Sequence, residues 1–368
     1  MLGAAVTWDV SNVGAVAETM GDAYGVSLAA VGLLTTALFV THLAVQIPGG
    51  RLIDRIGART VGLAALGIVA AANAFALSSP AFGVGLVARL VMGLGTGVGF
   101  VAGIDLVRAG KGGPFWQGAY GGSTMAAGGL ALMVVPQLVG SLDWRAPYWT
   151  GLVLALAGIV PVLAGGRAPA GAHASDAKVH ASVLHDRRLW PLAAIQMATF
   201  GLSVTAGNWI VTLLEHGGHA RDISGIVGGL VLFAGVVTRP LGGLLVQRSR
   251  RLAWKLVAVA LCAGAAGCLV LATGPPLWLA ALAALGAGLA AGLPFAAVFD
   301  RTLHLRPDAP AAAVGFVNGS AVLLILVGTP LAGLTFSLPG DGKLAFLAIG
   351  LLWATALLAV KRAAAPVR

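Results

Sequence analysis

A few charged side chains interrupt otherwise apolar runs of this chain, and they are the first candidates for chemistry. Asp9 and Glu18 lie in the first run, Arg89 in a run at 83–104, and Arg239 near the end of a run at 222–241. A charge within an apolar span is costly and therefore suggests function. The two acids could carry a proton, and the arginines could bind a carboxylate or oxyanion through the planar guanidinium.

Each of these charges has a second interpretation. Asp9 lies near the middle of a span over 1–20, or nearer the cytoplasmic interface if the segment starts at Met1. Arg89 either pairs with Asp9 or Glu18 or extends to the outer interface as a snorkelling side chain. Arg239 either faces a cavity or is an interfacial anchor near the end of its helix.

Other polar or aromatic side chains within the apolar runs would line a cavity or form interhelical hydrogen bonds. They are Asn12, His42, Gln46, Tyr120, Asn208, Trp209 and Asn318. No set of histidines or cysteines has a firm metal-ligand spacing, so we predict no metal and no cofactor. No H-E-x-x-H motif or paired carboxylates occur within the runs, so we predict that the chain is not an enzyme.

The composition explains why these residues are placed in a membrane. Of the 368 residues, 58% are hydrophobic and 10% charged, against about 25% charged in an ordinary soluble domain. Mean hydropathy is +0.93. This composition excludes a cytosolic enzyme. The net charge of +10 comes from basic residues in short loops between apolar runs, which is typical of membrane topology and not of nucleic-acid binding.

Twelve runs are long enough to span a bilayer, which needs about 20 apolar residues. They are 1–20, 28–47, 61–78, 83–104, 115–139, 146–164, 190–213, 222–241, 252–273, 277–299, 311–334 and 344–360. The polar stretch 165–189 reads as a cytoplasmic linker. We therefore predict an all-α polytopic membrane protein with two six-helix bundles, over 1–164 and 190–368.

The distribution of basic residues predicts the orientation. With the N-terminus inside, eighteen of the 23 lysines and arginines fall in cytoplasmic loops or tails, three fall outside, and Arg89 and Arg239 lie within helices. One missed span would invert every later loop, so this bias favours twelve spans with both termini in the cytoplasm.

The two halves repeat. Gly49-Gly50-Arg51-Leu52-Ile53-Asp54-Arg55 follows the second run, and Gly242-Gly243-Leu244-Leu245-Val246-Gln247-Arg248 follows the eighth, 193 residues later. At the same offset Gly93, Gly95 and Gly99 match Gly286, Gly288 and Gly292. Parallel six-helix repeats place a substrate site near the bilayer midplane.

The loop Gly50–Arg59 reads G-x-x-x-D-R-x-G-x-R between two spans. Here the chain resembles the major facilitator superfamily, whose loop between helices 2 and 3 carries this signature. The resemblance implies a cytoplasmic gate formed by Gly50, Asp54, Arg55, Gly57 and Arg59. Asp54 would meet Arg55 or Arg108, or cap a neighbouring helix. The alternative is a turn that only follows the positive-inside rule. Gln247 replaces the acid in the second copy, so that gate should be weaker.

The run Arg89–Gly97 is similar to the R-x-x-x-G-x-G pattern of the family's helix 4, where the arginine is linked to proton transfer. Arg239, two residues before Gly-Gly, is similar to the family's nitrate and nitrite porters. The first-half arginine of those porters is Gln46 here. Their glycine-rich signatures are loosely echoed at 118–123 and 315–320, so this further resemblance is weak.

Glycine pairs at G-x-x-x-G spacing are expected to pack helices. They are Gly93/Gly97, Gly118/Gly122, Gly225/Gly229, Gly288/Gly292 and Gly315/Gly319. The family's antiporter signature has Gly-Pro before a Gly-Gly in helix 5. Gly128-Gly129 lack that proline, which argues against drug/proton antiport.

We therefore predict a monomeric secondary transporter in the plasma membrane. It would move a small solute by alternating access, coupled to protons, with Arg239 favouring an anion or a carboxylate-bearing solute. The alternatives are a drug/proton efflux antiporter of the same superfamily and a non-transporting membrane sensor. The expected partners are the solute, the coupling proton and the lipid bilayer, with no nucleic acid.

Overall fold

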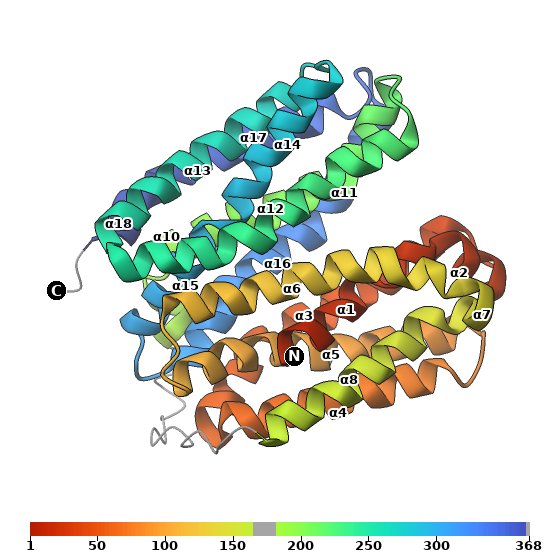
Figure 1. The fold of residues 1–368 in the computed structure, drawn as a ribbon, viewed down its shortest axis with the longest axis horizontal. Helices are drawn as coiled ribbons and strands as arrows, with labels where there is room; N and C mark the ends of the chain where they lie inside the picture. The colour runs from red at the N-terminus through yellow and green to blue at the C-terminus, as the bar shows by residue number, and fades with distance from the viewer. Residues whose placement is uncertain (165–181, 366–368) are drawn as a thin grey trace. The chain divides into compact units, whose positions relative to one another are not determined.

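The computed structural model describes residues 1–164 and 182–365, and no strand occurs among them. Eleven helical segments are long and apolar enough to cross a membrane, and each overlaps one of the predicted runs from 28–47 onwards (Figure 1). The chain is thus an all-helical integral membrane protein.

The first predicted run is helical but broken, which is why it is missing from the eleven. It consists of α1 (Leu2–Ser11), a short 3-10 turn η1 (Gly14–Val16) and α2 (Ala17–Tyr24). Helix α2 ends at Gly25, whose φ of +63° is the left-handed conformation typical of a glycine C-cap. The twelfth helix is present, although its two pieces are each too short to span alone.

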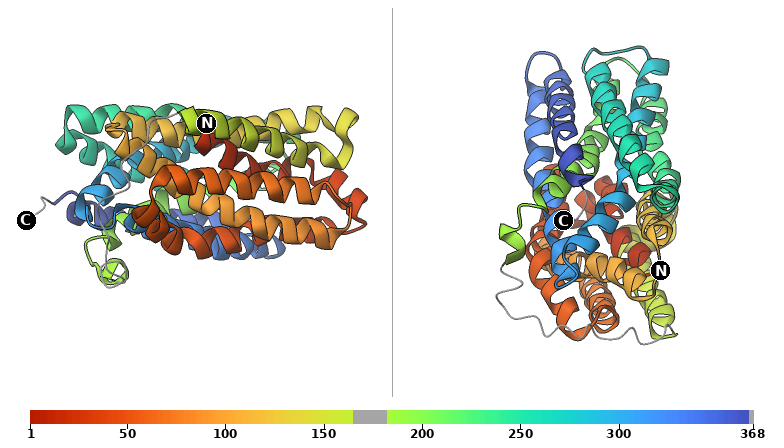
Figure 2. Two further views of the ribbon diagram at one scale, coloured as in Figure 1. Left: turned by 90° about the horizontal axis from the view of Figure 1, so that it is seen from below. Right: turned by 90° about the vertical axis from the view of Figure 1, so that its left-hand side faces the viewer.

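The remaining helices of the first half are long and joined by short turns. They are α3 (Leu28–Ile56), α4 (Ala58–Ala76), α5 (Phe82–Ala109), α6 (Pro114–Gln137), α7 (Val139–Leu142), η2 (Asp143–Arg145) and α8 (Ala146–Ala164). In Figure 2 the orange helices α4 and α5 run side by side.

The second half follows the same plan, with one π-helical segment at η3. Its elements are α10 (Trp190–Gln196), η3 (Met197–Leu202), α11 (Ser203–His216), α12 (Arg221–Arg248), α13 (Arg250–Leu271), α14 (Leu277–Gly292), α15 (Pro294–Leu305), α16 (Pro310–Leu334), η4 (Thr335–Ser337), α17 (Lys343–Thr355) and α18 (Leu357–Ala363).

The predicted loop at Gly50–Arg59 is mostly helix, so that prediction was wrong in its local structure. Helix α3 continues through Ile56, and the turn to α4 is made by Gly57 alone, with φ +91°. Gly50 lies within this helix, and the absence of a side chain allows close packing there: a Cβ would lie 2.6 Å from the Cα of Ala312. The second copy likewise lies within α12, which turns at Ser249.

By contacts the chain divides into two compact units. Unit 1 comprises Met1–Lys111, Ser123–Ala181 and Asp308–Gly315, and unit 2 comprises Gly112–Gly122, Ser182–Pro307 and Phe316–Arg368. The first residues of α6 therefore belong to unit 2, and the first residues of α16 belong to unit 1. The predicted bundles over 1–164 and 190–368 stay a prediction.

Glycines of α5 allow close packing on both sides in unit 1. A Cβ at Gly97 would lie 2.6 Å from the carbonyl oxygen of His42 on α3, and one at Gly95 would lie 2.8 Å from that of Ala65 on α4. By contrast, a Cβ at Gly225 would meet nothing within 4 Å. The expected packing role therefore does not extend to the Gly225/Gly229 pair.

The packing contacts also correct the offset of the repeat. Gly93 meets Leu38 and Thr41 on α3, whereas Gly288 of α14 meets Val231 and Ala234 on α12. The partners are 193 residues apart, but the glycines are 195 apart. Gly97 and Gly292 show the same relation. Spatially, Gly93 therefore corresponds to Gly288 and not to Gly286.

Candidate functional site

Asp9 lies at the centre of a buried polar cluster in unit 1. Its side chain is fully buried, as are those of Asn12 and Asn73. Asn12 Nδ2 donates to Asp9 Oδ1 at 2.9 Å, and Asn73 Nδ2 lies 3.3 Å from both carboxyl oxygens. Gly151 of α8 closes the cluster, because a Cβ there would meet Asp9 Oδ1. Helices α1, α4 and α8 thus enclose the carboxyl group.

Arg89 joins this cluster through the backbone of α1. Its Nη1 donates to the carbonyl of Asp9 at 2.7 Å and to Asn12 Oδ1 at 3.4 Å, and its Nε donates to the carbonyl of Leu34 at 3.3 Å. Arg89 is completely buried. The expected neighbour Asp9 is therefore present, but Arg89 donates to its backbone carbonyl. Snorkelling to an interface is ruled out for this side chain by its burial.

Two tyrosines lie beside Arg89. The hydroxyl groups of Tyr24 and Tyr148 are 2.9 Å apart, and both act electrostatically on the guanidinium. Trp144 packs against both rings, with centroids 5.9 and 6.3 Å away. The cluster thus combines a carboxyl group, a guanidinium cation and a pair of hydroxyl groups in apolar surroundings.

The cluster lies toward the end of unit 1 that carries residues 77–81. Asn73 is three residues from the last residue of α4, Gly151 is five from the first of α8, and Arg89 is seven from the first of α5. These positions are within about two helical turns of that end. The side chains that surround Asp9 therefore do not lie at the end of the unit that carries Arg55.

The other predicted residues of the first half are dispersed. Glu18 is exposed in the first turn of α2, so the structure does not place it beside Arg89. His42 is buried, and its Nδ1 lies 3.0 Å from Thr96 Oγ1. Gln46 is also buried, and neither its amide nitrogen nor its amide oxygen has a hydrogen-bond partner.

Asp54 caps the N-terminus of α16. Of the three partners considered for it, Arg55, Arg108 and a helix N-terminus, the structure shows hydrogen bonds to the helix N-terminus. Asp54 Oδ1 accepts from the amide of Ala311 at 3.0 Å and its Oδ2 from that of Ala312 at 3.1 Å. These amides are among the four that a helix N-terminus leaves without intrahelical partners, and the helix dipole favours a negative charge there. Both helix ends lie in unit 1.

The neighbouring signature residues play different local roles. Arg55 is exposed in the last turn of α3, where a cation complements the dipole. Arg59 donates to the carbonyls of Val162 and Leu163 at the end of α8. Gly57 provides the turn between the helices. Arg108, a considered partner of Asp54, forms an ion pair with Asp105 at 2.6 Å.

Arg239 is buried in unit 2 against an aromatic ring. Its Nη1 donates to the carbonyl of Gly121 at 2.8 Å, and its guanidinium carbon lies 4.3 Å from the ring centroid of Phe295. Tyr120 acts electrostatically on the same guanidinium. Because its exposed fraction is 2%, Arg239 is no interfacial anchor in this structure. The cation therefore lies over the ring of Phe295.

The remaining predicted residues of unit 2 have surroundings different from those of Arg239. Trp209 Nε1 donates to the carbonyl of Thr329 at 2.9 Å, and its ring packs on Phe336. Asn208 is exposed. Asn318 is buried, and its Oδ1 has no hydrogen-bond partner.

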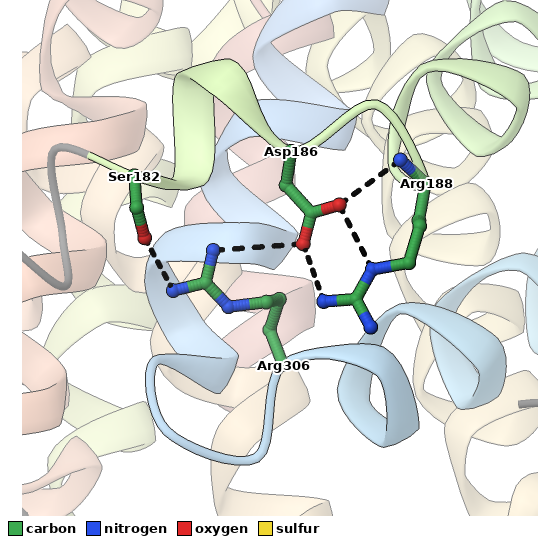
Figure 3. A network of polar contacts seen from close by, with 4 residues as sticks. All are labelled: Ser182, Asp186, Arg188 and Arg306. Atoms are coloured by element: carbon green, nitrogen blue, oxygen red, sulfur yellow. Dashed lines mark hydrogen bonds and ion pairs between the residues drawn. The ribbon is translucent and has the colours of Figure 1, made fainter. Parts of the chain in front are cut away.

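The end of the linker is tied to the loop after α15 (Figure 3). Asp186 accepts from Arg188 Nη2 at 2.8 Å and lies 3.7 Å from Arg306 Nη1. Arg306 Nη2 also donates to the hydroxyl of Ser182 at 3.0 Å. The predicted linker histidines His173 and His180 lie outside the described residues. Within 1–164 and 182–365 no group of histidine, cysteine and acidic side chains is arranged to hold a metal ion.

Sequence reasoning missed Asn73, Gly151, Tyr148 and Phe295. Asn73 is a polar residue inside a predicted span, the same signal that singled out Asn208, so it could have been found. Gly151 carries no such signal, because its role depends on which helix faces Asp9.

Comparisons with known proteins agree with this architecture. A family model described as Major Facilitator Superfamily matches residues 1–329. No curated protein sequence matches the chain significantly. The structure is similar to the human organic anion transporter MFSD10 (TETRAN), with a TM-score of 0.75 and 16% identity over 98% of this chain and 97% of that one.

A second similar structure is the E. coli fucose:proton symporter FucP. In its outward conformation the TM-score is 0.74 and the identity 14%, over 98% of this chain and 96% of that one. At such identities the similarity shows the fold alone. Because the family model covers most of the chain, and the fold agrees with it, the chain belongs to the Major Facilitator Superfamily.

Proposed function

We propose that this member of the superfamily moves a small anionic or carboxylate-bearing solute by alternating access, coupled to protons. Members of the superfamily are transporters and not enzymes, which supports a secondary transporter as the general function. The solute, the coupling ion, the monomeric state and the plasma-membrane location with cytoplasmic termini are parts of the proposal.

The buried guanidinium of Arg239 supports an anionic solute. Burying a cation within a membrane helix is costly, and such residues mark solute or ion pathways. The guanidinium lies over the Phe295 ring, and a guanidinium binds carboxylates and other oxyanions through its planar fork of N–H donors. MFSD10 is named as an organic anion transporter, which agrees with this choice.

The buried carboxyl of Asp9 supports proton coupling. An acid that is fully buried beside a buried arginine can change its charge when a proton binds. The similar structure FucP is named as a proton symporter.

The capped end of α16 supports the gating role of Asp54. Two hydrogen bonds and a charge–dipole interaction join α3 to this helix end and must break before the two separate. The charged contact is thus suited to holding one conformation of the cycle. The basic residues at this end favour a cytoplasmic location.

Uptake into liposomes tests the proposal. The purified protein, reconstituted with an inward proton gradient, should accumulate small carboxylates in preference to sugars and organic cations. Arg239→Gln should raise the apparent Kd about tenfold, as loss of one charged hydrogen bond of about 1.5–3 kcal/mol implies. Asp9→Asn should abolish accumulation and leave exchange intact.

The other outcomes identify the alternatives. Organic cations as the accumulated solutes, or unchanged affinity in Arg239→Gln, would exclude the anion assignment. Solute export driven by the gradient would identify an efflux antiporter, and binding without flux would identify a sensor.

A further inference from the structure

We propose that Asn73 is the residue that holds the coupling proton on Asp9. When the Asp9 carboxyl is protonated, its O–H donates to Asn73 Oδ1 while the Asn73 amide donates back to the other carboxyl oxygen. This inference rests on the proposed proton coupling and adds a partner to it. The proton is transferred from a hydronium ion: one of its O–H bonds breaks as the O–H bond on Asp9 forms, and a water molecule is left.

The hydrogen bonds of Asn73 leave one atom unsatisfied. Its Nδ2 lies 3.3 Å from both oxygens of Asp9 and 3.0 Å from the carbonyl of Val69. Its Oδ1 is buried and has no hydrogen-bond partner among residues 1–164 and 182–365. A buried polar atom of this kind is uncommon in proteins and calls for an explanation.

The chemistry of the two side chains supplies that explanation. An ionised carboxylate has acceptors alone, so it cannot satisfy the oxygen of an amide. A protonated carboxyl has one O–H donor in addition to its acceptors. Acid and primary amide then each have a donor for the other's acceptor. Proton binding to Asp9 thus gives Asn73 Oδ1 the partner that it lacks.

Gly151 provides the space for this pair. A Cβ on Gly151 would lie 2.7 Å from Asn73 Oδ1 and 2.9 Å from Asn73 Nδ2, and it would also meet Asp9 Oδ1. The two side chains therefore adjoin the same position on α8. Any larger residue at 151 would push them apart.

The side chains that bond Asp9 in this structure are all donors. Arg89 of α5 donates to the carbonyl of Asp9, and Asn12 of α1 and Asn73 of α4 donate to its carboxyl oxygens. Tyr148 of α8 and Tyr24 of α2 bond each other nearby. Asn73 Oδ1 is the atom that gains a bond when the proton arrives.

Infrared spectroscopy of the protein in liposomes tests the pair directly. The band of a protonated buried carboxyl is recorded as a function of pH and is assigned to Asp9 by its loss in Asp9→Asn. In Asn73→Leu the band should move to higher wavenumber, because the O–H loses its acceptor.

Two glycines on the same face of α8 provide a matched pair of variants. Gly151→Ala should shift the Asp9 band and its pH midpoint. Gly158→Ala, two turns further along, should change neither, because its Cβ would meet Leu66 at 3.2 Å and Ala5 at 3.4 Å, away from the cluster. Gly151→Ala keeps both polar side chains. It therefore tests the role of Asn73 even if Asn73→Leu fails to fold.

The outcomes separate the two proposals. If Asp9→Asn still accumulates solute with the proton gradient, the proposed coupling role of Asp9 is wrong. If Asp9→Asn abolishes accumulation but Asn73→Leu and Gly151→Ala keep the band and midpoint of the unmodified protein, the coupling role stands and the role of Asn73 is overturned.

Discussion

Asp54 and Gln247 stand 193 residues apart in the repeat and approach the starts of two different helices. Asp54 accepts from two amides at the start of α16. Gln247 lies beside Gly113, the residue just before α6. A Cβ on Gly113 would be 2.7 Å from Gln247 Nε2. The contact in unit 1 thus has a negative charge on a helix N-terminus, and its counterpart in unit 2 has a neutral amide.

The backbone packing around the two contacts is alike. Gly50 packs on Ala311 and Ala312 of α16, and Gly243, 193 residues later, packs on Pro114 and Phe115 of α6. The duplicated geometry with unequal charge supports the expectation that the second contact is the weaker one.

Asp54→Asn should leave the protein folded and slow its transport cycle. The substitution removes the charge from the α16 terminus and leaves one acceptor oxygen, a loss of about 1–2 kcal/mol in a buried contact. Transport rate at matched expression is the measurement. Arg55→Gln, an exposed neighbour, is the control and should have a small effect. A normal transport rate in Asp54→Asn would show that this contact does not act as part of the gate.

Gln247→Asp should strengthen the weaker contact. It places a negative charge at the start of α6, worth about 0.3–1 kcal/mol. The gain is limited because Pro114, the first residue of α6, has no amide hydrogen. A small rise in Tm and a slower cycle are expected, and a lowered Tm would show that the charge is not accommodated there.

The spans could be predicted from the sequence because long apolar runs and the bias of Lys and Arg are local signals. The signature residues could be found for the same reason, but their structure could not. Gly50 looked like part of a loop, whereas it lies within α3 and packs against Ala311 and Ala312, more than 250 residues away.

The polar cluster shows a second limit of sequence reasoning. Asp9 and Arg89 stand out as charges in apolar runs, but the sequence does not say which helices face them. The orientation of Asp9 toward Asn73 and Gly151 depends on how α1, α4 and α8 pack together. The two-residue difference in the repeat offset is likewise visible in contacts alone, because both offsets align glycine with glycine.

Gly97→Val should destabilise unit 1 strongly. A Cβ at this position would lie 2.6 Å from the backbone oxygen of His42 and 2.7 Å from the side chain of Val45, so α3 and α5 must separate. Overpacking of this kind typically costs about 1–3 kcal/mol or more. Thermal unfolding in detergent measures the loss. Gly83→Ala, at the start of α5, should be neutral or stabilising, because nothing lies within 4 Å of its Cβ.

The linker network should make stability depend on acid pH through Asp186. The hydrogen bond from the Arg188 guanidinium holds the pKa of the Asp186 carboxyl below its usual range. A carboxyl with a lowered folded-state pKa stabilises the folded protein above its unfolded pKa of about 3.9, and this contribution disappears as pH falls through the lower folded value. The difference in Tm between the unmodified protein and Asp186→Asn should therefore be constant from about pH 5 to 8 and shrink below about pH 4. Arg188→Gln should reduce the same difference, since it removes the main cause of the shift. A Tm difference that grows as the pH falls would contradict this assignment, because it would require a carboxyl whose pKa is raised by folding.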